Sequence, residues 1–347
     1  MARKRRERCY SSIFQKTQRE ESRRRKYYFK LAFAATVALI AVWVYPSRGR
    51  IMRKLLNRGP DPNAFKSIMN FTALHEMDEF EETWKFQSGN LAFRAAKVGG
   101  KKMFDRFSAI EYQDPGHEDH VLAFALYDGF DCPEVAESAE REVIPRIVID
   151  IIKESPDSMF GVANVIVKYL IKFEVSLMNF APLGTCGTTA LICVYYQNQY
   201  SAVVMGDSSF LLLNETGSRR SPYYPIKKEQ AKKLRAVGAP VHFKDGSWRL
   251  GNDLRANTSL GGSGYKSKNW IVTSFNVDVI DKKLEKYDHV VAGSNGFWDV
   301  MKEQEVVAIV KQFENEPDFG AEQLMKSALK KGPTDHVFVV VAKLKYF

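Results

Sequence analysis

The segment most suggestive of chemistry is Gly-Ser-Asn-Gly at 293–296, where a run of β-branched and apolar residues ends in a tight turn. A strand that ends in such a turn raises its last side chains at the edge of a sheet, which is a favourable place for a metal ligand. The residue at the tip is Asn295, an amide rather than a carboxylate. Hard divalent cations prefer anionic oxygens, so Asn295 would be a weak ligand there.

A second turn in a similar setting is Asp128-Gly129, which follows the apolar run of residues 120–127. An Asp-Gly pair is ordinarily a turn and nothing more, because these two residue types suit turn geometry. Taken by itself, the pair therefore favours a plain turn over a metal-binding carboxylate.

The composition of the 347-residue chain, 45% apolar, is enough for one large domain or two small ones. Its net charge of +10 lies at the N-terminus, because residues 1–60 hold 17 Lys and Arg against three Glu. The rest holds 34 Lys and Arg against 38 Asp and Glu, so the globular body is nearly neutral. A nucleic-acid binder would be basic throughout, and we expect no nucleic-acid partner.

The four cysteines, Cys9, Cys132, Cys186 and Cys193, show no CxxC spacing. Neither a disulfide framework nor a zinc site is therefore expected. Cys186 and Cys193 lie in or beside a strand-like run, and we expect both to be small apolar core residues.

Residues 27–45 have the length and composition of a membrane-spanning helix, with Lys30 as their one charge and aromatic residues at both ends. A buried core helix would not have such basic flanks, and no cleavage site of a signal peptide follows. The sequence thus predicts a basic tail (1–26), a single transmembrane helix (27–45), a juxtamembrane linker (46–83) and a large domain (84–347). We expect a single-pass membrane protein, with the endoplasmic reticulum as the favoured location.

The orientation of this helix stays open. The 26 residues before it carry eleven Lys and Arg and the fifteen after it carry five, which favours a cytosolic N-terminus and a lumenal domain. Sequons at Asn70, Asn214 and Asn257 permit that placement, although such triplets also occur by chance. Because both flanks are basic, the charge bias does not decide the orientation.

The large domain alternates strand-like runs with amphipathic helices, which predicts two extended sheets covered by helices. Helices are expected at 133–153, 159–177, 227–238, 302–313 and 318–331, and strands at 120–129, 288–293 and 336–344, with one long hairpin over 188–213 around Gln197-Asn198-Gln199.

Four blocks of the domain occur in a characteristic order: "MFDRF" (103–107), "ALYDGFD" (125–131), "GTTALI…VVMGDSSFLLL" (187–213), and "GSNGFWDVMKEQEVV" with "GPTDHVFVVVAKL" (293–344). Together they resemble the protein phosphatase 2C family of metal-dependent Ser/Thr phosphatases, over nearly the whole domain. The resemblance implies an α+β fold, a four-layer α-β-β-α sandwich of two antiparallel sheets. It also implies two Mg²⁺ or Mn²⁺ ions that activate a water to attack phosphoserine or phosphothreonine.

The resemblance assigns roles to individual residues. Asp128 would bridge the metals and Gly129 would offer its carbonyl oxygen, while Asp105 and Asp128 would be the catalytic carboxylates. The implied metal-binding positions are Asp128, Gly129, Asp207, Asn295 and Asp335.

The sequence departs from the family pattern where chemistry is needed. Phe130 stands in place of a histidine that protonates the leaving group, and Gly100 in place of an arginine that binds the phosphate. Adjacent Lys101 and Lys102 are more simply solvated lysines. Phe104 and Gly262 replace further acidic residues, and His336, which replaces an asparagine, is more simply a structural residue than a ligand.

Two functions follow from this pattern of retention and loss. The favoured one is a membrane-anchored homologue with little or no phosphatase activity, which binds a phosphoprotein or a regulatory protein. The alternative is a working Mg²⁺- or Mn²⁺-dependent phosphatase with an atypical site. An unrelated membrane protein with coincidental Asp-Gly turns fits the ordered blocks poorly.

Overall fold

The computed structural model describes residues 70–73, 83–88, 90–99, 103–113, 120–158, 160–178, 184–197, 199–252, 254–281 and 287–344. All of them belong to one unit, Lys66–Phe347. The predicted basic tail and membrane helix lie outside the described residues, as do Gly100, Lys101 and Lys102. Within the described part, no helix combines the length and the apolar character that a membrane span requires.

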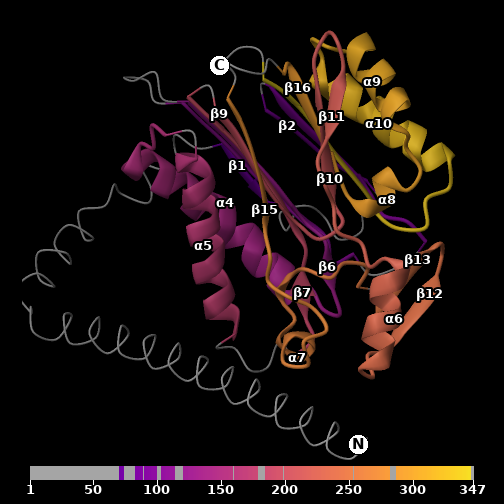
Figure 1. Ribbon diagram of the computed structural model, residues 1–347. Helices are drawn as coiled ribbons and strands as arrows, with labels where there is room; N and C mark the ends of the chain where they lie inside the picture. The colour runs from indigo at the N-terminus through magenta and orange to yellow at the C-terminus, as the bar shows by residue number, and fades with distance from the viewer. Residues whose placement is uncertain are drawn as a thin grey trace, which may run out of the picture. The chain divides into compact units, whose positions relative to one another are not determined.

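The first of two large sheets has six antiparallel strands in the order β1-β4-β5-β8-β9-β15 (Figure 1). These strands are β1 (Asn70–Ala73), β4 (Arg106–Gln113), β5 (His120–Tyr127), β8 (Ala190–Tyr196), β9 (Gln199–Met205) and β15 (Asn276–Asp281). Strand β1 comes from the segment predicted as linker, so part of that segment belongs to the sheet.

The second sheet also has six antiparallel strands, in the order β11-β10-β16-β17-β3-β2. These strands are β2 (Thr83–Ser88), β3 (Leu91–Ala96), β10 (Ser209–Leu213), β11 (Ser218–Arg220), β16 (His289–Gly293) and β17 (Val337–Lys343). The predicted pair of antiparallel sheets is confirmed.

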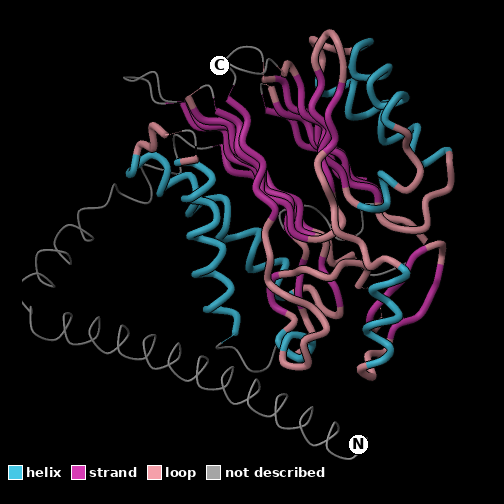
Figure 2. The backbone as a smooth tube through the Cα atoms, viewed as in Figure 1, coloured by secondary structure: helices cyan, strands magenta, loops and turns pink. Residues whose placement is uncertain are grey.

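Helices cover the outer face of each sheet, and the strands lie between them (Figure 2). Helices α4 (Glu134–Glu154) and α5 (Gly161–Met178) pack on the first sheet, and α9 (Glu303–Gln312) and α10 (Pro317–Lys330) pack on the second. Alternate residues of β5 show the layering, because Val121 faces the helices while Leu122 faces the other sheet. Both faces of the central strands are therefore buried, which explains their continuous apolar sequences.

A smaller lobe lies beside one end of the sandwich (Figure 1). It contains helix α6 (Lys228–Ala236), the hairpin of β12 (Val241–Lys244) and β13 (Ser247–Leu250), and the short helix α7 (Ser263–Lys266). Three two-residue strands, β6 (Gly129–Phe130), β7 (Gly187–Thr188) and β14 (Leu260–Gly261), form a minor sheet in the order β14-β7-β6. An apolar cluster that includes Phe130, Leu234 and Tyr265 forms the core of this lobe.

The five helices predicted in the large domain all appear, with ends shifted by one or two residues. The predicted hairpin over 188–213 is wrong in its second half. Strands β8 and β9 do pair around Gln197, but β10 belongs to the other sheet. The chain crosses between sheets at Gly206–Ser208, which apolar patterning alone does not indicate because both strands are fully buried.

The expectation about the cysteines is corrected in part. Cys132 and Cys186 form a disulfide across a sequence separation of 54, so Cys186 is not a simple core thiol. The pairing arises because Cys132 follows β6 and Cys186 precedes β7, and these two strands are hydrogen-bonded neighbours. Cys193 is a buried free thiol, as expected.

Candidate active site

The polar residues singled out from the sequence lie at strand ends. Asp105 directly precedes β4, Asp128 directly follows β5, and Asp207 lies two residues beyond β9. Asn295 is the first residue of α8 (Asn295–Trp298), just after β16, and Asp335 lies two residues before β17. Both sheets thus send polar side chains to the same end of the sandwich.

The register of the strands explains this convergence. Arg106 pairs with Tyr127, so the start of β4 and the end of β5 are adjacent, and Asp105 and Asp128 become neighbours. Gly293 pairs with both Ser209 and Val339, which brings the segments of Asn295, Asp207 and Asp335 together. A backbone hydrogen bond of 2.9 Å from Thr189 N to Asp128 O fixes the chain after β5.

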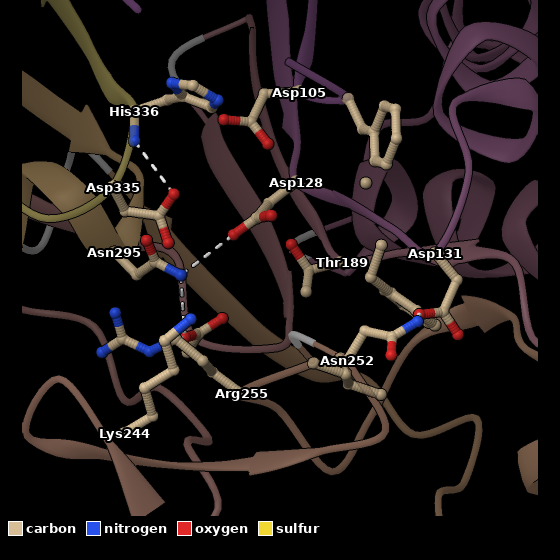
Figure 3. Close-up of a pocket in the computed structure, with 15 residues that line it drawn as sticks. Asp105, Asp128, Asp131, Thr189, Lys244, Asn252, Arg255, Asn295, Asp335 and His336 are labelled. Atoms are coloured by element: carbon tan, nitrogen blue, oxygen red, sulfur yellow. Dashed lines mark hydrogen bonds and ion pairs between the residues drawn. The ribbon is translucent and has the colours of Figure 1, made fainter. Parts of the chain in front are cut away.

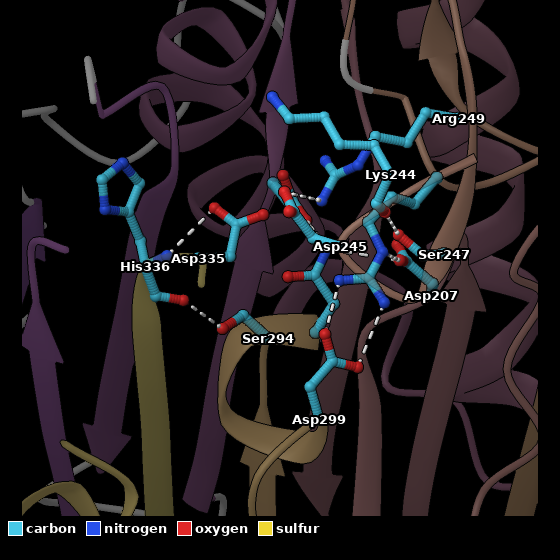
Figure 4. A network of polar contacts seen from close by, with 12 residues as sticks. Asp207, Lys244, Asp245, Ser247, Arg249, Ser294, Asp299, Asp335 and His336 are labelled. Carbon is cyan, nitrogen blue, oxygen red and sulfur yellow. Dashed lines mark hydrogen bonds and ion pairs between the residues drawn. The ribbon is translucent and has the colours of Figure 1, made fainter. Parts of the chain in front are cut away.

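The turn at Asn295 requires the glycine that follows it. A Cβ on Gly296 would lie 2.2 Å from His336 O, so only glycine allows α8 to approach β17 this closely. Ser294 supports the same contact, because its hydroxyl donates to His336 O at 3.0 Å and accepts from Phe338 N at 3.1 Å (Figure 4).

All six predicted site residues line one cavity of about 380 Å³ (Figure 3). Its lining consists of Phe104, Asp105, Asp128, Gly129, Phe130, Asp131, Thr189, Asp207, Lys244, Asn252, Leu254, Arg255, Asn295, Asp335 and His336. Asp105, Asp207 and Asn295 are less than a tenth exposed. Sequence motifs that are far apart therefore form a single polar site.

Repulsion among the buried carboxylates is strong. Burial, followed by the negative charge of Asp335, raises the pKa of Asp105. Burial, followed by the charges of Asp105 and Asp207, raises the pKa of Asp128 well above its ordinary value. A cluster of this kind is stabilised by protons, by cations or by hydrogen-bond donors.

Asn295 supplies such donors. Its Nδ2 group donates to Asp128 Oδ2 at 3.1 Å and to Asp207 Oδ2 at 3.2 Å (Figure 3). The amide nitrogen, rather than the amide oxygen, therefore lies between these two carboxylates. Each of the two carboxylates thus accepts one hydrogen bond from Asn295.

Arg255 is a member of the site that the sequence analysis did not identify. Its guanidinium forms a two-pronged pair with Asp299, with Nη1–Oδ2 at 2.6 Å and Nη2–Oδ1 at 3.1 Å. Its Nε lies 3.5 Å from Asp207 Oδ2. No motif identified from the sequence includes Arg255.

The residues that depart from the family pattern have structural roles. Phe130 is 4% exposed and belongs to the apolar cluster of the smaller lobe. His336 is buried, and its Nδ1 accepts a hydrogen bond of 3.0 Å from Val98 N, which agrees with the structural role expected for it. Gly262 has a φ of +65°, which suits glycine better than the acidic residue of the family pattern.

The residues present fit a pair of divalent ions only in part. Asp105, Asp128 and Asp335 offer anionic oxygens, which hard cations prefer. Asp207 and the facing oxygen of Asp128 are instead directed at N–H groups of Asn295 and Arg255. Among the described residues, only Cys132, Glu134 and Cys186 bring three candidate ligand atoms within 4.8 Å of one another, and the two cysteines form the disulfide. The donor set therefore matches a two-metal centre only in part.

Comparisons with known proteins agree with this architecture. The profile of one family, Protein phosphatase 2C, matches residues 91–337. Protein phosphatase 1L from Bos taurus is 24% identical over 275 residues, covering 77% of this chain and 76% of that protein.

Two solved structures share the fold. The crystal structure of serine-threonine phosphatase 2C from Toxoplasma gondii aligns with a TM-score of 0.58 and 16% identity, covering 75% of this chain and 98% of that one. A C. elegans sex determining protein aligns with a TM-score of 0.60 and 20% identity, covering 75% of this chain and 65% of that one.

Proposed function

Since the chain belongs to the protein phosphatase 2C family, we propose that it is a membrane-anchored phosphatase homologue with little or no hydrolytic activity. In this proposal it acts by binding a phosphoprotein or a regulatory protein. The family generally depends on Mg²⁺ or Mn²⁺, so activity requires side chains that hold and use such ions.

The observation that carries the proposal is the position of Asn295 Nδ2 between Asp128 and Asp207. Metal-bound hydroxide, the nucleophile of two-metal hydrolysis, requires ions held by anionic oxygens. An amide contributes no negative charge, and its N–H groups engage the oxygens that would bind a cation. Weak metal binding at this cavity is the consequence.

Phe130 supports the same conclusion independently of the metal. It follows Asp128-Gly129 directly and lines the cavity, yet a phenyl ring cannot transfer a proton to a leaving group. Loss of a general acid typically costs about 10²–10⁴ in rate. Even with metal bound, hydrolysis would therefore be slow.

The alternative is an active Mg²⁺- or Mn²⁺-dependent phosphatase. Four aspartates at the cavity, Asp105, Asp128, Asp207 and Asp335, favour it. If it is correct, the full chain hydrolyses a phosphoserine peptide in Mn²⁺, and Asp128→Ala abolishes that hydrolysis.

The deciding experiment measures Mn²⁺ affinity by calorimetry and p-nitrophenyl phosphate hydrolysis on the full chain in mild detergent. We expect wild type to bind Mn²⁺ weakly and to be nearly inactive. Asn295→Asp should bind Mn²⁺ at least tenfold more tightly, about 1.4 kcal/mol. Tight binding of two ions to wild type, together with rapid hydrolysis, would overturn the proposal.

Asn252→Asp is the matched control, because Asn252 lines the same cavity and donates to a different carboxylate, Asp131, at 3.3 Å. It adds the same charge away from Asp128 and Asp207. We expect its Mn²⁺ affinity to stay within about threefold of wild type, a difference of less than about 0.7 kcal/mol.

Binding to phosphoproteins has its own test. Fluorescence anisotropy with paired phosphoserine and unmodified peptides should show preference for the phosphorylated form. Equal affinity for both forms would leave a regulatory protein as the partner class.

Residues 27–45 are proposed as the anchor, and extraction of the full chain from membranes by alkaline carbonate would argue against it.

A further inference from the structure

Arg255 is held rigidly by its neighbours in the chain. Leu254 and Ala256, on either side of it, form isolated β-bridges with Leu250 and Pro225. The carbonyl of Arg255 accepts a hydrogen bond of 2.6 Å from Ile226 N. Leu254 and Ala256 are both buried, so the backbone is fixed and the Arg255 side chain lines the cavity.

The guanidinium connects two carboxylates that come from different parts of the fold. Asp207 lies in the crossing between the sheets, and Asp299 follows α8, which begins at Asn295. The contacts are the two-pronged pair with Asp299 and the 3.5 Å approach of Nε to Asp207 Oδ2.

The two sides of the cavity differ in the groups that contact their carboxylates. Asp207 Oδ2 accepts the hydrogen bond of 3.2 Å from Asn295 Nδ2 and lies 3.5 Å from Arg255 Nε. Asp128 Oδ2 accepts the hydrogen bond of 3.1 Å from Asn295 Nδ2. Arg255 therefore contributes its positive charge on the Asp207 side.

We propose that the guanidinium of Arg255 occupies the position of a divalent cation between Asp207 and Asp299, so that these two carboxylates stay together without a metal. The inference rests on the proposed function, because it explains how a site that binds metal weakly keeps its structure. The ligand that the Arg255 guanidinium replaces is a hard divalent cation, Mg²⁺ or Mn²⁺. Arg255 is a positioning residue in this role.

A simple surface ion pair would look different. Arg219 and Asp278 provide the comparison, since their side chains are 40% and 13% exposed and meet through one contact of 2.9 Å. The Arg255 side chain is 9% exposed and serves two carboxylates, one of which is 3% exposed. Asp299 is 40% exposed, whereas Asp207 is buried, so Asp207 is the carboxylate that most requires a positive partner.

The test asks whether loss of Arg255 makes the thermal stability of the protein depend on Mn²⁺. Thermal unfolding of the full chain in mild detergent is measured in EDTA and in millimolar Mn²⁺ for wild type, Arg255→Ala and Arg219→Ala. We expect wild type to show no shift with Mn²⁺. Arg255→Ala should unfold about 5–10 °C lower in EDTA, and Mn²⁺ should restore at least half of the loss.

Arg219→Ala controls for the general loss of an arginine that pairs with an aspartate. It should lose less stability, and Mn²⁺ should restore none of it. Arg255→Gln is the second variant, which keeps a polar side chain without the charge. If Arg255→Ala does not fold, the same metal-dependent recovery is expected in Arg255→Gln.

Calorimetry gives an independent readout, with Mn²⁺ binding at least tenfold tighter in Arg255→Ala than in wild type. The inference is wrong if Mn²⁺ recovers neither Arg255 variant, or if it stabilises wild type as much as Arg255→Ala. Phosphatase activity of wild type would contradict the proposed function alone, since the metal-dependent recovery does not depend on turnover.

Discussion

The ring of Phe130 lies directly over Gly187, its partner in the minor sheet. A Cβ on Gly187 would lie 2.3 Å from Phe130 Cζ and 2.6 Å from Leu260 O, so the two residues are matched in shape. Phe130 also stacks near Tyr265, with ring centroids 6.4 Å apart. The position next to Asp128-Gly129 thus anchors the smaller lobe to the sandwich.

This match predicts energetic coupling between the two residues. Gly187→Ala should destabilise wild type by about 1–3 kcal/mol through overpacking, and Phe130→Ala by about 3–5 kcal/mol through loss of buried apolar contact. Gly187→Ala should cost less when Phe130 is alanine, with the contact to Leu260 O as the remaining clash. A double-mutant cycle by urea unfolding measures this, and additive effects would show that the contact does not matter.

The buried aspartates predict how stability without metal depends on pH. Asp105 and Asp128 have raised pKa values in the folded protein, chiefly through burial. Above about pH 4, where unfolded carboxyls lose their protons, the folded state binds more protons than the unfolded state. Stability in EDTA should therefore fall as pH rises from about 4 toward neutral, by up to about 1.4 kcal/mol per pH unit for each such group.

Asp105→Asn tests this directly by urea unfolding at pH 5 and pH 8. The variant should be more stable than wild type at pH 8, with a smaller difference at pH 5. Asp157→Asn, at an exposed position, is the control and should leave the pH dependence unchanged. If the free energy of unfolding changes equally with pH in wild type and in Asp105→Asn, Asp105 does not contribute to the pH dependence.

The Cys132–Cys186 disulfide predicts sensitivity to reduction. It closes a loop with a sequence separation of 54, which is expected to contribute roughly 4 kcal/mol, against a typical measured range of about 2–4 kcal/mol. Thermal unfolding of wild type should shift downward in dithiothreitol. Cys132→Ser/Cys186→Ser should start lower and show no response, and a response in this variant would assign the effect elsewhere.

A buried ion pair beneath the smaller lobe gives a further prediction. Glu174 on α5 accepts from Lys266 Nζ at 2.5 Å and from Gly261 N at 2.9 Å. Lys266→Ala leaves this carboxylate without its cation and should cost about 3–5 kcal/mol. Lys266→Met with Glu174→Gln should recover part of that loss in urea unfolding, and no recovery would indicate that packing of the lysine stem dominates.

Local sequence patterns predicted most of the elements. Continuous apolar runs identified the central strands, and a period of 3.6 residues identified the helices. The same patterns failed at Gly206–Ser208, where the chain passes between two sheets whose strands are equally apolar. They also placed Asn70–Ala73 in a linker, since a short edge strand carries little periodic signal.

The sequence by itself, through its resemblance to the family, determined that the aspartates, Asn295 and Phe130 belong to one site. Only the tertiary structure decided how they interact: that the amide nitrogen of Asn295 faces Asp128 and Asp207, that Arg255 joins Asp207 to Asp299, and that Cys132 pairs with Cys186. The physical reason is that these contacts join residues 44 to 167 positions apart, or 54 for the disulfide. Packing of the two sheets and the smaller lobe brings them together, and no local pattern records it.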